Sequence, residues 1–160
     1  MKSFWLKALP LLACLLIAAG CGSGAKLGNI TIDVTSYTPT PLENQAQLIL
    51  RYTNENIFPI AIGETKAKLY LNSEYVGMVS QDNPVGIPQL NTATRPATLV
   101  IEKPEIVQKI LSSSATSVAY RLESTMRLEV SEDRSKIQTV YSGQLEVASF
   151  RAAPVPDKKN

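Results

Sequence analysis

The chain has 160 residues with a hydrophobic fraction of 44%, which suits one folded domain with appendages and is too apolar for a disordered chain. Its 16 basic and 14 acidic residues give a formal charge of +2, and a mature chain without Lys2 and Lys7 would hold 14 of each. A neutral domain without a basic run lacks the electrostatic footprint of a nucleic-acid-binding protein. The sequence contains no His, which excludes Ser–His and Cys–His catalysis, His metal ligation and a His-based pH switch.

The first segment has the features of an export signal. Two lysines in residues 1–7 precede an almost wholly apolar run, residues 8–19, which is shorter than the ~20 residues needed to span a bilayer. The run ends in Ile-Ala-Ala-Gly-Cys at 17–21, which resembles the bacterial lipobox, where a signal peptidase cuts before a Cys that becomes acylated. We therefore predict a lipoprotein signal peptide over 1–20 and lipidation of Cys21. The alternative is an ordinary signal peptide, cut after an A-x-A-like site, which leaves a free thiol.

Lipidation would hold the rest of the chain at a membrane. Cys14 lies in the apolar run and would be removed, so the mature chain would hold one acylated Cys and no intramolecular disulfide. Residues 21–29 contain several Gly and are expected to form a short flexible linker. Gly22, rather than Asp, follows the Cys. By analogy with enterobacterial sorting, we expect a protein of the bacterial cell envelope, anchored in the outer membrane and facing the periplasm.

The rest of the chain shows mainly the period-2 alternation of half-buried strands. The expected strands, in chain order, are Ile30–Thr35, Ala46–Tyr52, Lys66–Leu71, Val76–Val79, Ala97–Glu102, Val118–Val130 and Ile137–Val147. Residues 80–96 are rich in Asn, Pro, Gln and Thr and are predicted to form a long loop. One short helix is expected near 104–112, where Pro104 suits a first helical position. Arg151–Asn160 is expected to be a flexible tail.

These elements favour an all-β fold over residues 30–150. About seven strands with a turn signal every ten residues or so are typical of a two-sheet antiparallel β-sandwich of immunoglobulin or fibronectin type III appearance. The alternation indicates one dry and one wet face for each sheet.

A break separates the second predicted strand from the third. Asn54 and Asn56 flank a single residue, and Asn tolerates positive φ while its side chain bonds nearby backbone. Phe58 and Ile60 are expected to re-enter the core, and Pro59 fits only a strand start, an edge or a bulge. We interpret Asn54, Asn56, Phe58 and Pro59 as a structural corner. The alternative is a polar lip that binds a partner.

The order of motifs around this corner resembles the WHy (water stress and hypersensitive response) domain of group 2 late-embryogenesis-abundant (LEA type 2) proteins. The matching features are Asn-Glu-Asn at 54–56, Phe-Pro-Ile at 58–60, Leu-Asn at 71–72, Tyr-Val-Gly at 75–77, Ile-Pro at 87–88 and the strand 97–102. The resemblance covers Ile30–Val147, and members often have Asn-Pro-Asn where this chain has Glu55 in the middle. It implies a folded β-sandwich linked to desiccation and stress responses, and it implies no known active site.

Other constellations point to no reaction. Ser23 and Lys26 match the S-x-x-K of serine β-lactamases, but they lie in the linker and no K-T-G follows. Glu132 and Asp133 form a carboxylate pair in a predicted hairpin turn. The alternating Arg and Glu residues of 121–129 are typical of a solvated sheet face. We expect no enzyme activity, cofactor, metal or small-molecule substrate.

The sequence therefore favours a non-enzymatic lipoprotein held at a membrane by Cys21. The expected role is stress protection, through binding of partly unfolded client proteins at sheet edges and at residues 80–96. The alternative is a structural or assembly lipoprotein that binds one specific envelope partner. Nucleic acid is not expected among the partners.

Overall fold

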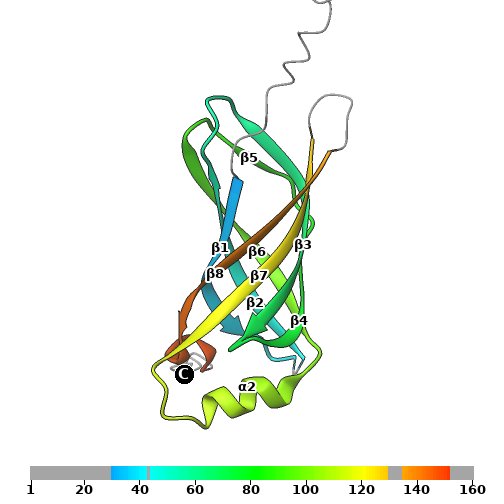
Figure 1. Ribbon diagram of the computed structural model, residues 1–160. Helices are drawn as coiled ribbons and strands as arrows, with labels where there is room; N and C mark the ends of the chain where they lie inside the picture. Colours follow the sequence, from blue (N-terminus) through cyan, green and yellow to red (C-terminus); the bar gives the residue numbers. More distant parts are fainter. Residues whose placement is uncertain (1–29, 43, 130–134, 152–160) are drawn as a thin grey trace, which may run out of the picture.

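The computed structural model describes residues 30–42, 44–129 and 135–151, and these are built almost wholly of antiparallel strands (Figure 1). The elements are β1 (Ile30–Pro39), β2 (Gln45–Asn54), β3 (Ile60–Leu71), β4 (Glu74–Gln81), β5 (Val85–Ile87), β6 (Asn91–Ile101), α2 (Pro104–Leu111), β7 (Ser117–Leu128), β8 (Lys136–Glu146) and the 3-10 helix η1 (Val147–Phe150). The all-β class and the helix near 104–112 are confirmed.

The strands form one continuous sheet. Their hydrogen-bonded order is β1-β2-β6-β4-β3-β7-β8, and β5 pairs with β3 off this path. The sheet curls until its two edge strands, β1 and β8, lie beside each other (Figure 1). The predicted division into two sheets is therefore corrected. Alternation requires each strand to have a dry face, and a sheet that curls on itself provides that face as well as a second sheet does.

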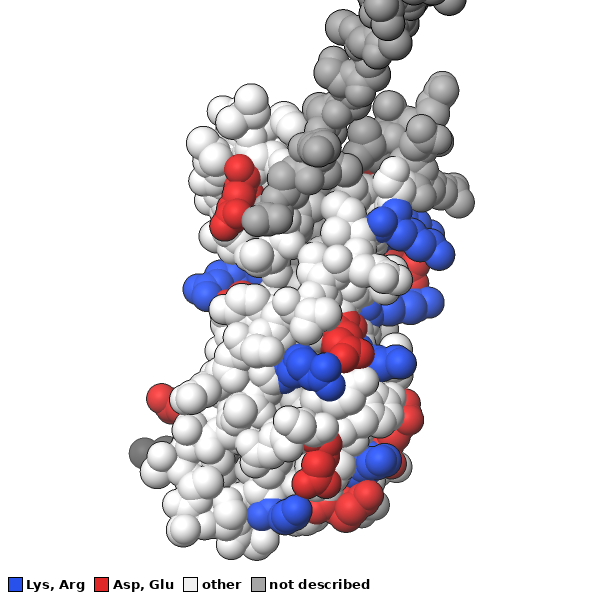
Figure 2. Space-filling view, viewed as in Figure 1, with Lys and Arg blue, Asp and Glu red and all other residues white. Residues whose placement is uncertain are grey.

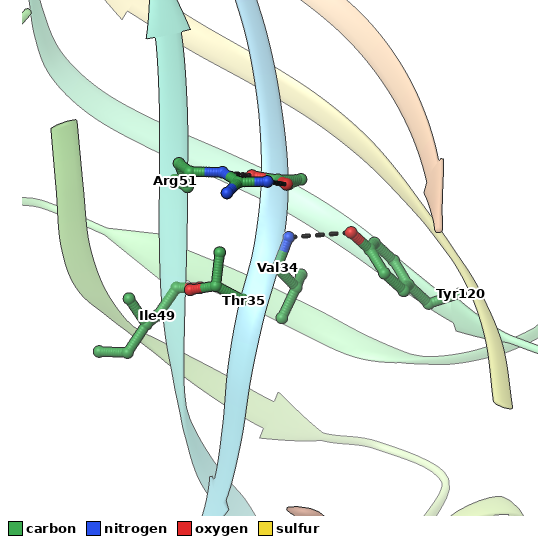
Figure 3. A network of polar contacts seen from close by, with 6 residues as sticks. Val34, Thr35, Ile49, Arg51 and Tyr120 are labelled. Atoms are coloured by element: carbon green, nitrogen blue, oxygen red, sulfur yellow. Dashed lines mark hydrogen bonds and ion pairs between the residues drawn. The ribbon is translucent and has the colours of Figure 1, made fainter. Parts of the chain in front are cut away.

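A side chain joins the two edges of the curled sheet. β1 has a bulge between Val34 and Ser36, and the Val34 N–H donates to the hydroxyl of Tyr120 in β7, 3.0 Å away (Figure 3). Tyr120 lies over Gly143, its partner in β8, where an added Cβ would come within 2.8 Å of the ring. Glycine at this position therefore lets the ring pass over β8 and reach β1.

The core fills the inside of the curl. Its largest fully buried side chains are Tyr52, Phe150, Ile32, Leu48, Leu50, Ile62, Leu69, Leu71, Ile87, Leu99, Leu122 and Met126. α2 and η1 cover one end, which we call the lower end (Figure 1). There Ile110 of α2 is buried, and Phe150 of η1 stacks on Tyr37 with ring centroids 4.2 Å apart.

The predicted loop over residues 80–96 is wrong in part, because it contains β5 and the first half of β6. The half from Asn91 to Pro96 pairs with β2 alone, because β4 pairs with β6 only at Thr98–Ile101. A proline is tolerated beside such a free strand edge. Most side chains of this half are exposed, so the stretch lacks the alternation by which a strand is found.

The opposite end, which we call the upper end, gathers the start of β1 and two connections between strands. Strand register places Ile30 opposite Asn54, and Asn54 opposite Asn91. Ile60 lies opposite Ile87. The connections 55–59 and 88–90 therefore lie together at the end where β1 begins (Figure 1).

Several predictions concern residues outside those described. They are the signal peptide over 1–20, lipidated Cys21 with its linker, the carboxylate pair Glu132 and Asp133, and the tail beyond Arg151. Within the described ranges, no helix has the length and apolar character needed to cross a bilayer.

Candidate functional site

The amide of Asn54 holds the upper end together. Asn54 is the last residue of β2 and is 1% exposed. Its Nδ2 donates to the carbonyl oxygens of Phe58 (2.9 Å), Pro88 (3.1 Å) and Ile87 (3.3 Å). Its Oδ1 accepts the backbone N–H of Asn56 at 2.9 Å and the Asn56 side-chain amide at 2.8 Å. One buried side chain thus bonds to both connections of the upper end.

This network explains why an amide stands at position 54. Three carbonyl oxygens face its nitrogen, so this side needs a donor, and two N–H groups face its oxygen, so that side needs an acceptor. A carboxylate of the same shape would place oxygen against oxygen. A further bond, from Leu90 N to the Asn56 carbonyl at 3.1 Å, joins the two connections directly.

Phe58 and Pro59 lie at the surface of this corner rather than in its interior. Phe58 is half-buried against the core and Pro59 is exposed, whereas Ile60 is 4% exposed. The sequence-based expectation that Phe58 enters the core is therefore corrected. The chain returns to the interior at Ile60, where pairing with β5 begins.

An open groove of about 690 Å³ lies beside this corner. It is lined by Phe58, Pro59, Ile60, Ala61, Gly86, Ile87, Pro88 and Glu129. Ala61 and Gly86 are paired across β3 and β5, and both are directed away from the core. A Cβ added at Gly86 would meet no atom within 4 Å, so the groove is open above this residue. Its lining is mostly apolar.

Glu129 provides the one charged side chain among the groove-lining residues. Its N–H donates to the Ala61 carbonyl at 2.9 Å, which continues the sheet for one residue beyond β7. Gly63 lies at a bulge of β3, and a Cβ there would collide with the Glu129 carboxylate. The glycine therefore makes room for a carboxylate beside apolar surface, an arrangement that suits a ligand with both an apolar and a cationic group.

Two large aliphatic side chains are exposed on the connections of the upper end. Ile57 is 79% exposed and Leu90 is 69% exposed. Figure 2 shows mostly uncharged surface at this end, while Lys and Arg gather on the flank of β3 and β7. Neither residue was singled out from the sequence. The sequence signal that could have identified them is an apolar residue beside Asn or Pro in a predicted turn, because burial in a core does not explain an apolar residue there.

The charged face predicted over 121–129 is an outer sheet face laced with ion pairs. Arg121 bonds to Glu123 at 2.7 Å, and Glu64 of β3 contacts Lys66 at 2.9 Å and Arg127 at 3.6 Å. Solvent-exposed pairs of this kind contribute little to stability. Among the described residues, no group of three or more His, Cys, Asp or Glu side chains could hold a metal ion.

Comparisons with known proteins concern the fold. No protein-family model and no curated protein matches the chain. The solution structure of AT1g01470 from Arabidopsis thaliana is 12% identical, with a TM-score of 0.50 over 79% of this chain and 87% of that one. An Archaeoglobus fulgidus protein is 13% identical, with a TM-score of 0.44 over 76% and 97%. At2g46140.1, described as a candidate LEA protein, is 12% identical, with a TM-score of 0.42 over 88% and 85%. At 12% identity, the likeness to AT1g01470 concerns the fold alone.

Proposed function

We propose that the chain is a non-enzymatic lipoprotein of the bacterial envelope, anchored through Cys21, with a domain of the LEA type 2/WHy kind that protects partly unfolded client proteins. The observation that carries the proposal is the open apolar groove at the upper end. The order of motifs at 54–60 and 87–88 supports the family assignment.

The groove suits an extended segment of a client chain. Ala61 and Gly86 have small side chains, so a bound backbone can come close to the strands. Phe58, Pro59 and Pro88 offer apolar contact, and Glu129 can pair with a Lys or Arg of the client. A volume of about 690 Å³ holds a few side chains rather than a folded surface. We therefore expect weak, reversible binding that depends on exposed apolar sequence rather than on one client fold.

The groove takes the place of the sheet edges as the binding surface. β1 and β8 lie beside each other, and Tyr120 occupies the Val34 N–H, so strand addition at these two edge strands has little room. Of the segment 80–96, only Gly86, Ile87 and Pro88 line the groove. Asn54 holds the groove walls before any client arrives, which lowers the entropy lost on binding.

A substitution that fills the groove tests this function. A Cβ at position 86 would meet no atom within 4 Å, so Gly86→Arg should obstruct the groove without unfolding the protein. The matched control is Gln144→Arg, which adds the same charge to an exposed position of β8. The assay is aggregation of a heat-sensitive or dried reporter enzyme, with an equal mass of albumin as reference. Gly86→Arg should lose most of the protection and Gln144→Arg should keep it. Protection no better than albumin by the wild-type protein would refute the protective role.

The anchor is tested separately. Cells are labelled with an alkynyl palmitate, and the wild-type protein is compared with Cys21→Ala. We expect label on the wild type alone, and an unprocessed or released Cys21→Ala protein. A wild-type protein without label would show that Cys21 is not acylated.

The second candidate function is assembly with one fixed envelope partner. The observation in its favour is the rigidity of the groove, since the walls are fixed by three hydrogen bonds from one buried amide. Cross-linking in intact cells separates the two functions: one stoichiometric adduct indicates assembly, and many different adducts indicate client protection.

A further inference from the structure

Ile57 and Leu90 are exposed on the two connections of the upper end, and we call this pair of residues the apex. The two residues come from different connections between strands, and the Leu90 N–H donates to the Asn56 carbonyl at 3.1 Å. The apex is therefore one surface held by backbone contacts. Its side chains are 79% and 69% exposed, and neither lines the groove.

The backbone of Leu90 gives an independent reason to look for a role here. Its φ is 50°, a left-handed conformation that favours Gly or Asn. The other described non-glycine residues with positive φ are Asn72 and Ser73, both polar residues of the turn between β3 and β4. At position 90 a branched apolar side chain is kept in a strained, solvent-exposed place, where neither packing nor backbone preference accounts for it.

The chain preceding β1 ends at this same end of the molecule. Ile30 lies opposite Asn54, so the linker 21–29 joins the domain beside the apex (Figure 1). An extended chain covers about 3.3–3.6 Å per residue, so this linker reaches roughly 30 Å. An acylated Cys21 would thus hold the apex within reach of the bilayer surface, while α2 would face away from it.

The charges at the apex select the kind of lipid surface. The described charged residues nearest the apex along the two connections and at the groove rim are Glu55 and Glu129, both acidic. Acidic side chains beside the apex give it no attraction to anionic lipid, so contact has to come from apolar side chains on a zwitterionic surface.

We propose that the apex inserts Ile57 and Leu90 into the surface of a zwitterionic lipid bilayer and so fixes the orientation of the tethered domain. This rests on the lipid anchor of the proposed function, because two aliphatic side chains bind a bilayer weakly by themselves. The tether makes the contact intramolecular and raises the effective concentration of lipid at the apex.

The test uses tryptophan fluorescence, since Trp5 is the only Trp of the chain and lies in the predicted signal peptide. The full-length protein carrying Ile57→Trp is purified from membranes and reconstituted into phosphatidylcholine–phosphatidylethanolamine vesicles with bromine on the acyl chains. The control is Leu42→Trp, at another exposed site (60%) between β1 and β2 at the lower end. The wild-type protein supplies the background from Trp5.

Flotation with the vesicles reports the anchor, and quenching by bromine reports the apex. We expect the Ile57→Trp protein to be quenched several-fold more than the Leu42→Trp protein, to be insensitive to salt, and to lose quenching when Leu90→Asp is added. Flotation with equal quenching at both sites would overturn the apex contact and leave the anchor standing. Loss of flotation would overturn both. A blue shift of the Ile57→Trp emission that needs no lipid and grows with protein concentration would show self-association instead, and would also overturn the proposal.

Discussion

The two ends of the curled sheet are closed in opposite ways. At the lower end, α2 and η1 bury apolar side chains, and Phe150 stacks on Tyr37. At the upper end, within the described residues, closure comes from the amide of Asn54, and the apolar residues Ile57 and Leu90 stay outside. Hydrogen bonds that fix loops while leaving aliphatic side chains in water do not maximise stability. We propose from this difference that the lower end stabilises the fold and that the upper end binds.

The largest expected effect is at the lower end. Phe150→Ala should lower the free energy of unfolding by about 3–5 kcal/mol, because it empties a fully buried aromatic site. Phe58→Ala at the upper end should cost only about 1–2 kcal/mol, because this ring is half-buried. Urea denaturation monitored by circular dichroism measures both. Equal losses would mean that the two ends share the stability evenly, against this account.

Next in size is the amide at the upper end. Asn54→Ala deprives buried carbonyl groups of their donor, at about 1–3 kcal/mol for each group that finds no water. Asn54→Asp should be worse, because it places a carboxylate oxygen against the same carbonyls, although its shape is unchanged. Asn56→Ala is the milder comparison. Thermal unfolding gives the order, and an Asn54→Asp protein as stable as wild type would show that the network does not hold this end.

The hydrogen bond between Val34 and Tyr120 provides a test by pH. Burial raises the pKa of Tyr120, and that of Tyr37, to about 12 from the ordinary value of 10.0. The neutral phenol is the form that the folded state favours, so this stabilisation is complete below pH 10 and is lost as the pH rises from about 10 to about 12. Tyr120→Phe should lower the free energy of unfolding by about 1–2 kcal/mol at neutral pH, because the Val34 N–H loses its acceptor. The free energy of unfolding of this variant should also fall less steeply than that of the wild type as the pH rises from about 10 to about 12. Parallel pH profiles for both proteins would contradict this.

The smallest effect is a gain. Leu90→Gly should raise the free energy of unfolding by up to about 1 kcal/mol, because the left-handed conformation costs an ordinary residue about 1–2 kcal/mol. Part of the gain is offset by the freedom that glycine adds to the unfolded chain. Leu90→Ala removes the same apolar contact without relieving the backbone, so it is the matched control. Leu90→Gly less stable than Leu90→Ala would show that the left-handed backbone at position 90 does not lower the stability.

The sequence predicted those elements whose pattern follows burial. Alternation located β3 and β7, and Pro104 with an apolar face located α2, because one face of each packs on the core. The upper half of β6 was missed, since Asn91–Pro96 is exposed on both faces and has only β2 as partner. The closure of the sheet was missed because it depends on Tyr120 reaching Val34 across Gly143, a contact between residues far apart in sequence.

The hydrogen-bonding role of Asn54 could be predicted from the sequence, but the groove and the apex could not. Two Asn residues around one turn position indicated side-chain bonds to backbone, and Asn54 makes them. The groove could not be predicted, because it arises where β5 places Gly86 beside Ala61 of β3. The apex could not be predicted either, since only the fold shows that Ile57 and Leu90 lie together and in water.

The central claim, that the upper end is the binding end, is tested most directly by cross-linking in living cells. A photo-reactive phenylalanine analogue replaces Gly86, where space is open, and in a second strain it replaces Gln144 on the exposed face of β8. We predict adducts to other proteins from position 86 and few or none from position 144, with more adducts after drying or heat. Adducts formed equally at both positions, or mainly from position 144, would contradict the assignment of binding to the upper end.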